Sequence, residues 1–177
     1  MFEILKLKNL SKSFGAVTVT DQLNCSLKNG EALGIIGPNG AGKTSMFNLI
    51  TGTLKPDSGQ IFFAGEDITH SNAAKRSRSG IARSFQVPQP FSGLSVFENA
   101  MVAATQSAGL YGKKAEQYCL SILNQTELLP KANILAGSLT LLELKRLELT
   151  RALCTRPKLL LLDEIAGGLT DDECTSL

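Results

Sequence analysis

The chain has 177 residues, of which 43% are hydrophobic, and a formal net charge of +2. This length can bury the core of one domain. The small positive charge gives no argument for nucleic acid as a partner, because a nucleic-acid-binding face normally makes a domain far more basic. No apolar run reaches the ~18 residues that suggest a transmembrane helix, and the N-terminus MFEILKLKNL lacks a signal-peptide pattern, so we expect a cytoplasmic protein.

The cysteines suggest neither a metal site nor a disulfide framework. They are scattered, without a C-x-x-C pair, and His70 is the only histidine. We therefore expect free thiols at all four positions, Cys25, Cys119, Cys154 and Cys174.

Two antiparallel strands are predicted near the N-terminus. Phe2–Leu7 and Gln22–Leu27 alternate or run apolar, and the stretch between them contains Gly15. Phe14 is the aromatic residue of interest here. It could stack on a purine ring, which needs a flat apolar partner, or it could be a core residue.

The stretch GPNGAGKTS predicts a phosphate-binding loop of the form G-x-x-x-x-G-K-[ST]. It follows the apolar run Ala32–Ile36, expected as a strand, and precedes Met46–Ile50, expected as a helix. Glycines allow backbone N–H groups to turn toward a phosphate at a helix N-terminus, Lys43 adds charge, and Thr44 offers a hydroxyl to Mg²⁺. The alternative is a glycine-rich turn without a nucleotide, although chance rarely supplies the Lys-Thr pair as well. The predicted ATP-binding residues are Gly37, Pro38, Asn39, Gly40, Ala41, Gly42, Lys43, Thr44 and Ser45.

A turn at Lys55–Gly59 is expected to lead into a strand at Ile61–Phe63. The segment Asp67–Ser79 is polar and contains Lys75, Arg76 and Arg78. We interpret it as a solvated helix face, with an anion site as the alternative.

A strand is predicted over Ile81–Phe85, and Gln86 follows it. Polar residues at the carboxyl end of a strand in an open α/β sheet lie where ligands bind. Pro88 and Pro90 then predict a loop that cannot join the sheet.

Three helices are predicted next: Leu94–Thr105, with a capping box of Ser95 and Glu98, then Lys113–Leu128 and Leu139–Leu153. In the third helix, Leu144 and Leu147 lie nearly opposite the face of Leu142, Leu149 and Leu153. We expect this helix to be buried on both sides, and the helical block to contact the sheet domain on one side and something outside the chain on the other.

The run Lys158–Leu162 predicts a strand that is covered on both faces and ends in Asp163 and Glu164. Because charges are costly to bury, two acids at this point indicate a metal site or a reacting group. Asp163 would hold Mg²⁺, and Glu164 would position or deprotonate a water. A strand ending in solvated acids is the alternative. Thr170–Glu173 is another capping box and predicts one more helix.

Together these motifs resemble the nucleotide-binding subunits of ATP-binding cassette (ABC) transporters over essentially the whole chain. GPNGAGKTS resembles the Walker A loop, Gln86 in ARSFQ the Q-loop, and LLLLDE the Walker B strand with Glu164 as the catalytic glutamate. Phe14 falls where the family stacks an aromatic ring on adenine. GIARSFQ, FSGLSVFENAMVA and DEIAGGLT look most like the importers of branched-chain amino acids and their amide or urea relatives. The segment resembling the family signature, which contacts the ATP of the partner subunit, is Leu139, Thr140, Leu141, Leu142 and Glu143.

The resemblance implies an α/β fold: a P-loop NTPase core with a mostly parallel sheet, an N-terminal antiparallel β-layer and an inserted α-helical subdomain. Residues 1–177 would be a single ABC ATPase domain, with the core sheet and β-layer in 1–85 and 156–177 and the Q-loop and helical subdomain in 86–155. The implied cofactors are ATP and Mg²⁺, with Glu164 and Gln86 catalytic and Thr44, Gln86 and Asp163 at the metal.

The implied partners are a second ABC ATPase subunit, integral-membrane permease subunits and, indirectly, a solute-binding protein, with no nucleic acid. The implied location is the cytoplasmic face of the plasma (inner) membrane. A cassette ATPase of DNA repair or translation is disfavoured, because those proteins carry insertions or tandem cassettes that this chain lacks.

Three departures from the family pattern bear on hydrolysis. Leu142 stands where the signature has a glycine, and its side chain would obstruct the approach to a γ-phosphate. Ile165 replaces a common proline. The switch histidine and last core strands expected beyond Glu164 are absent from the 177 residues. We therefore expect an incomplete subunit that is a poor ATPase. The alternative to a working subunit is a truncated or degenerate cassette that binds nucleotide with little or no hydrolysis.

Overall fold

The computed structural model describes residues 2–176. They form two compact units, Met1–Arg76 and Ser77–Leu177. Helix α2 (Ala73–Ser79) contains the boundary between the two units. The expected single domain over 1–177 stays a prediction.

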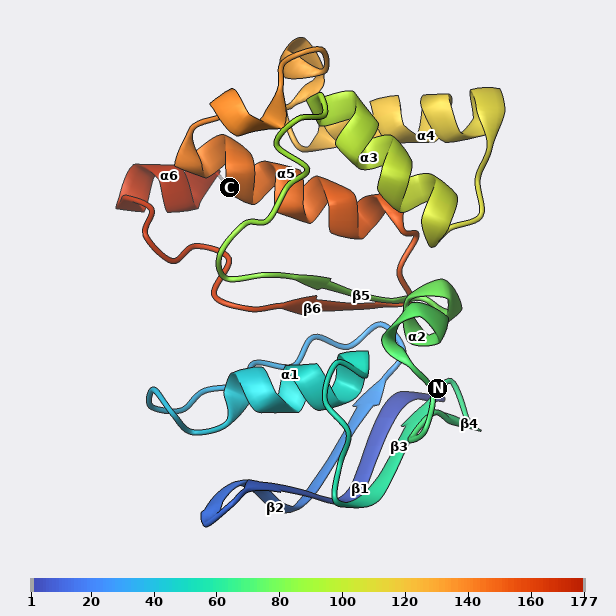
Figure 1. Cartoon of the computed structure of the whole chain (residues 1–177), viewed down its shortest axis with the longest axis vertical. Helices are drawn as coiled ribbons and strands as arrows, with labels where there is room; N and C mark the ends of the chain where they lie inside the picture. Colours follow the sequence, from blue (N-terminus) through green and yellow to red (C-terminus); the bar gives the residue numbers. More distant parts are fainter. Residues whose placement is uncertain (1, 177) are drawn as a thin grey trace. The chain divides into compact units, whose positions relative to one another are not determined.

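An antiparallel sheet is the frame of the first unit. Its strand order is β2-β1-β3-β4 (Figure 1). The two predicted N-terminal strands lie in a hairpin that turns at Gly15, where φ is 57°. The two strands are longer than the apolar segments from which they were predicted, because the hydrogen-bonded pairing of β1 and β2 continues through polar residues. Their bounds are β1 Glu3–Phe14, β2 Val17–Lys28, β3 Ser58–Phe63 and β4 Glu66–Asp67.

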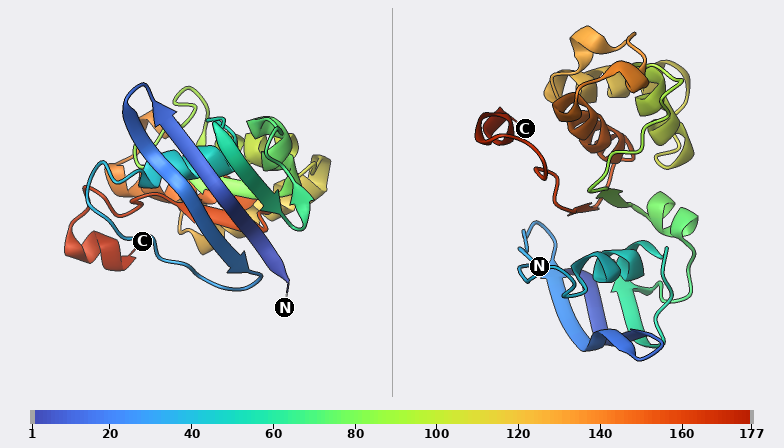
Figure 2. Two further views of the ribbon diagram at one scale, coloured as in Figure 1. Left: turned by 90° about the horizontal axis from the view of Figure 1, so that it is seen from below. Right: turned by 60° about the vertical axis from the view of Figure 1, so that its left-hand side comes forward.

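Helix α1 (Lys43–Thr51) covers one face of this sheet (Figure 2). Its buried side chains include Leu49 and Ile50, which are almost fully buried, as are Leu7 and Leu10 of β1 and Ile61 of β3. The helix ends at Gly52, whose left-handed backbone (φ 79°) lets its N–H bind the carbonyl of Asn48. The predicted helix after the phosphate loop is thus confirmed.

The strand expected at Ala32–Ile36 does not form, and this prediction is wrong. Residues 31–38 have no regular secondary structure, and Ile36 is 99% exposed. An apolar run becomes a strand only when a neighbouring strand pairs with its backbone. The sheet of this unit consists of β1, β2, β3 and β4 alone, so these residues have no ladder there.

The solvated face predicted for Asp67–Ser79 is wrong for Arg76, which is only 2% exposed. Its guanidinium donates to four main-chain carbonyls, those of Leu49, Ile50, Thr69 and Ser71, at 2.6–2.9 Å. Two of these belong to the last turn of α1, where carbonyls lack helical partners and a cation is favoured. Arg76 therefore closes the C-terminal end of the helix that follows the phosphate loop.

The second unit combines two parallel strands with a block of helices. β5 (Ile81–Ser84) and β6 (Leu159–Leu162) pair in parallel, with Ser84 opposite Leu162. The helices α3, α4 and α5 pack against one another, and α5 also packs on β5 (Figure 1). Their bounds are α3 Val96–Gln106, α4 Gly112–Gln125, α5 Leu141–Cys154 and α6 Asp171–Ser176, with short 3₁₀ helices at Leu129–Lys131 and Ala136–Ser138.

The capping boxes predicted from sequence are confirmed. Ser95 and Glu98 exchange hydrogen bonds at the start of α3, and Thr170 and Glu173 do so at the start of α6. Helix α5 is buried on two sides as expected, but leucines line only one of them. Leu147 lies in the core of the helical block, whereas the other buried side carries charged residues, Lys145 and Glu148.

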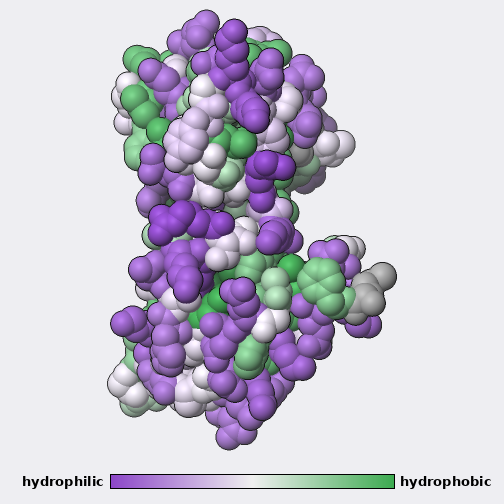
Figure 3. Space-filling model, turned by 90° about the vertical axis from the view of Figure 1, so that its right-hand side faces the viewer, coloured by the Kyte–Doolittle hydropathy of each residue, from purple (hydrophilic) through white to green (hydrophobic). Residues whose placement is uncertain are grey.

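The face drawn in Figure 3 is mostly hydrophilic, with hydrophobic residues between the polar side chains. Within residues 2–176, no helix is both long enough and apolar enough to cross a membrane. All four cysteines are free thiols, as expected.

We predict that Arg76→Met lowers the free energy of unfolding by about 3 kcal/mol, because carbonyls that stay buried lose a charged donor. Urea denaturation measures the change. Arg78→Met, an exposed arginine on the same helix, is the matched control and should change stability by less than about 0.5 kcal/mol. Equal losses in the two variants would contradict the assigned role of Arg76.

Candidate functional site

The phosphate loop of the first unit has backbone geometry that requires glycine. Gly40 and Gly42 are left-handed, with φ of 83° and 86°, and Gly42 is the N-cap of α1. A Cβ on Gly42 would lie 2.3 Å from the carbonyl oxygen of Val19 in β2. A side chain is therefore excluded both by the backbone conformation and by the contact. The loop leads directly into the N-terminus of α1, where backbone N–H groups can bind an anion.

Lys43 is the first residue of α1 and turns back over the loop. Its amine donates to the carbonyls of Gly37 at 2.6 Å and Pro38 at 2.9 Å. An ammonium group has three donors, so one remains for a phosphate oxygen. Thr44 and Ser45 follow in the first turn of α1 and carry hydroxyl groups. This set of amides, ammonium and hydroxyls fits a nucleotide phosphate chain with its hard cation.

Phe14 is not a core residue. It ends β1 with 52% of its surface exposed, and the amine of Lys12 lies 5.5 Å from its ring centre. That amine also binds Asp57 at 2.5 Å, and this hydrogen bond, followed by one from the Ser13 backbone, lowers the pKa of the Asp57 carboxyl. The exposed ring is thus open to stacking, as the purine interpretation requires.

In the second unit, the parallel register brings the predicted polar residues together. Gln86 follows β5, and Asp163 and Glu164 follow β6, so all three lie at the same end of this strand pair. The side-chain amide of Gln86 donates to Glu164 Oε2 at 2.5 Å. Glu164 has φ of 47°, a left-handed conformation that few non-glycine residues adopt and that is often found at functional sites.

Asp163 and Glu164 are adjacent in sequence but differ in environment. Glu164 is exposed, whereas the Asp163 carboxylate is buried and binds the guanidinium of Arg83 at 2.6 Å. The two side chains of this pair are only 6% and 7% exposed. Arg83 was not among the predicted site residues, although an arginine inside a short strand of buried residues was a usable signal.

In the described part of the chain, no three His, Cys, Asp or Glu side chains gather as a possible metal site. The magnesium predicted at Thr44, Gln86 and Asp163 involves a different set of donors and stays a prediction.

Comparison with known proteins assigns the family. The ABC transporter family profile matches residues 20–167. The probable branched-chain amino acid transport ATP-binding protein LivG of Methanocaldococcus jannaschii is 35% identical, over 96% of this chain and 72% of that protein. The chain belongs to the ABC transporter family.

Other ABC proteins agree with this assignment. The high-affinity branched-chain amino acid transport ATP-binding protein BraF of Pseudomonas aeruginosa is 34% identical, over 98% of this chain and 74% of that protein. A crystal structure of the ADP conformation of an ABC transporter's ATP-binding cassette superposes with a TM-score of 0.87 at 32% identity, covering 99% of this chain and 74% of the other. The expected α/β fold of a P-loop NTPase is thereby confirmed, and the family is one of ATPases.

The segment that resembles the ABC signature opens α5. Thr140 is the N-cap, and Thr140 and Glu143 form a capping box. Leu139 is buried, Leu141 is 44% exposed, and Leu142, in the position of the family's glycine, is half-buried. The hydrogen bond from Lys131, followed by that from the Thr140 backbone, holds the pKa of the Glu143 carboxyl below its ordinary value of 4.5.

We predict that Arg83→Met destabilises the chain by about 3 kcal/mol, because a buried carboxylate loses its cation. Adding Asp163→Asn should restore more than half of the loss, since the second charge is then removed as well. Chemical denaturation of both single variants and the double variant measures this. If the losses in unfolding free energy of the two single variants add up in the double variant, the pair is not coupled.

Stability should also depend on pH through Glu143. Because the folded-state pKa is lowered, ionised Glu143 stabilises the fold above pH 4.5, and this contribution disappears as the pH falls through the folded-state pKa. We predict that Glu143→Gln costs about 1 kcal/mol at neutral pH and progressively less as the pH falls from 4.5 through the folded-state pKa. Denaturation at several pH values, with exposed Glu116→Gln as control, measures this. A loss that is independent of pH would contradict it.

Proposed function

We propose that this chain is the ATP-binding and hydrolysing subunit of an ABC importer for branched-chain amino acids or related small solutes, coupling MgATP hydrolysis to transport. The observation that carries the proposal is the glycine-dependent loop ending at Lys43 on the N-terminus of α1. The names of the LivG and BraF relatives support the solute class. The same proposal gives the chain a permease and a second ATPase subunit as partners and places it at the cytoplasmic face of the membrane.

The residues take distinct roles in the proposed site. The loop amides and Lys43 bind the phosphates, and Phe14 stacks on the adenine. Thr44, Gln86 and Asp163 would hold Mg²⁺ through oxygen atoms, and the ion would supply positive charge to neutralise the phosphates. Glu164 orients and deprotonates the attacking water, and Gln86 holds its carboxylate through their hydrogen bond at 2.5 Å.

A cassette that binds nucleotide with little or no hydrolysis is the second candidate. Leu142 favours it, because a half-buried leucine in the first turn of α5 takes the place of the family's glycine. That helix end is the part of the subunit that would approach the ATP of a partner subunit. Binding at the chain's own loop does not depend on Leu142.

We predict that the purified chain binds MgATP and that Lys43→Ala weakens binding at least about tenfold, since a charge-assisted phosphate contact is lost. Isothermal titration measures the affinity, and Lys113→Ala, an exposed lysine on α4, is the control. Turnover then separates the two candidates. Hydrolysis that Glu164→Gln abolishes supports the ATPase, binding without turnover supports the second candidate, and no binding contradicts both.

A further inference from the structure

The loop after β5 has few main-chain partners of its own. Pro88 and Pro90 lack an N–H group, so Gln89 between them carries the single backbone donor of this three-residue stretch. Residues 85–91 belong to no helix or strand. The buried main-chain groups of such a loop need partners from elsewhere, and side chains are one source of them.

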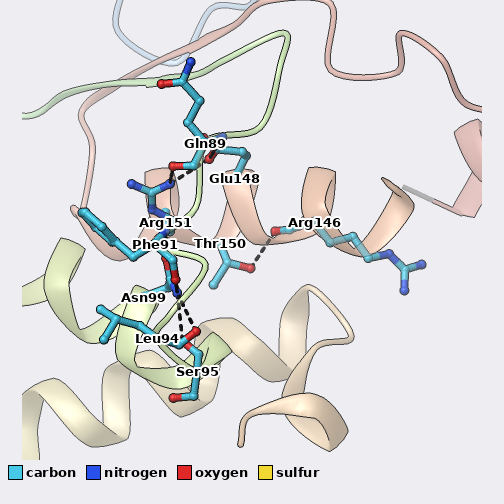
Figure 4. A network of polar contacts seen from close by, with 9 residues as sticks. All are labelled: Gln89, Phe91, Leu94, Ser95, Asn99, Arg146, Glu148, Thr150 and Arg151. Atoms are coloured by element: carbon cyan, nitrogen blue, oxygen red, sulfur yellow. Dashed lines mark hydrogen bonds and ion pairs between the residues drawn. The ribbon is translucent and has the colours of Figure 1, made fainter. Parts of the chain in front are cut away.

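Three charged side chains of α5 bind the backbone of this loop. Lys145 donates to the carbonyl of Gln86. Glu148 accepts the N–H of Gln89 at 3.0 Å, and Arg151 donates to the carbonyl of the same residue at 2.7 Å (Figure 4). Both main-chain groups of Gln89 are therefore bound by one helix.

The charged side chains that make these contacts are buried or paired with each other, so the contacts are a fixed part of the fold. Lys145 is 4% exposed, and the Glu148 side chain is 5% exposed. Glu148 and Arg151 are also paired to each other at 2.7 Å. Charges are buried in proteins only where partners compensate for the lost hydration, and here the loop backbone is one of those partners.

The far end of the loop is held in a second way. Asn99 of α3 is fully buried and binds both main-chain groups of Phe91, its N–H at 2.9 Å and its carbonyl at 3.1 Å. The loop thus rests on two helices of the block. Its one catalytic candidate, Gln86, lies at the end held by α5.

We propose that Lys145, Glu148 and Arg151 are positioning residues, which form a clamp that holds the backbone of Gln86–Gln89 so that the Gln86 amide reaches Glu164. The catalytic consequence of the clamp rests on the proposed function. Because α5 begins in the signature segment, with Thr140 as its N-cap, the clamp also joins that segment and Gln86 through one helix.

Hydrogen exchange of the full chain tests the clamp directly. In Glu148→Leu, exchange at the Gln89 amide should accelerate more than about tenfold, because its acceptor is gone. Glu148→Gln keeps an acceptor oxygen and should preserve most of the protection. Glu116→Gln on α4 is the charge-matched control and should leave exchange unchanged. Unchanged exchange in Glu148→Leu overturns the clamp.

Turnover tests the consequence for Gln86. Glu148→Leu and Arg151→Met should lower kcat at least about tenfold, since Gln86 loses its alignment, while the affinity for ATP measured without Mg²⁺ stays within about twofold. Glu148→Gln should recover most of kcat. Faster exchange with unchanged kcat overturns the positioning role. If the wild-type chain binds MgATP without turnover, the proposed hydrolysis fails, and the exchange result alone decides the clamp.

Discussion

Main-chain groups that helices and strands leave without a partner, at helix ends and in loops, must be bound by other groups, and in each unit charged side chains bind several of them. Arg76 binds four carbonyls, two of them at the end of α1. Glu148 and Arg151 bind both main-chain groups of Gln89. These side chains are charged, so each hydrogen bond is stronger than one between neutral groups. The functional segments of both units are therefore fixed by a few arginines and acids as well as by hydrophobic packing.

The features that the sequence predicted are local. The helix after the phosphate loop, the N-terminal hairpin and the capping boxes each depend on residues within a few positions of one another, and each is confirmed. The contact of Gln86 with Glu164 joins distant parts of the chain and was not predicted; it results from the parallel pairing of β5 and β6, which places the carboxyl ends of both strands at one edge.

The features that the sequence did not predict depend on distant partners. No residue near Arg76 in the sequence indicates that its side chain binds the end of α1, and none near Arg83 indicates that it pairs with Asp163. The strand expected at Ala32–Ile36 failed for the same reason, since hydrophobicity is a property of the segment whereas pairing is not. Glu148 and Arg151 were overlooked because the leucines of α5 dominate its pattern, although their three-residue spacing places both on one face of the helix.

The left-handed backbone of Glu164 implies a trade-off between stability and function. Such a conformation costs about 1–3 kcal/mol for a residue with a side chain, and glycine would adopt it without strain. Glycine, however, would remove the carboxylate that Gln86 binds. With the catalytic role proposed for Glu164, a substitution at position 164 that is chosen for thermal stability alone would remove the reacting carboxylate, so the most stable form of this chain and its most active form should differ there.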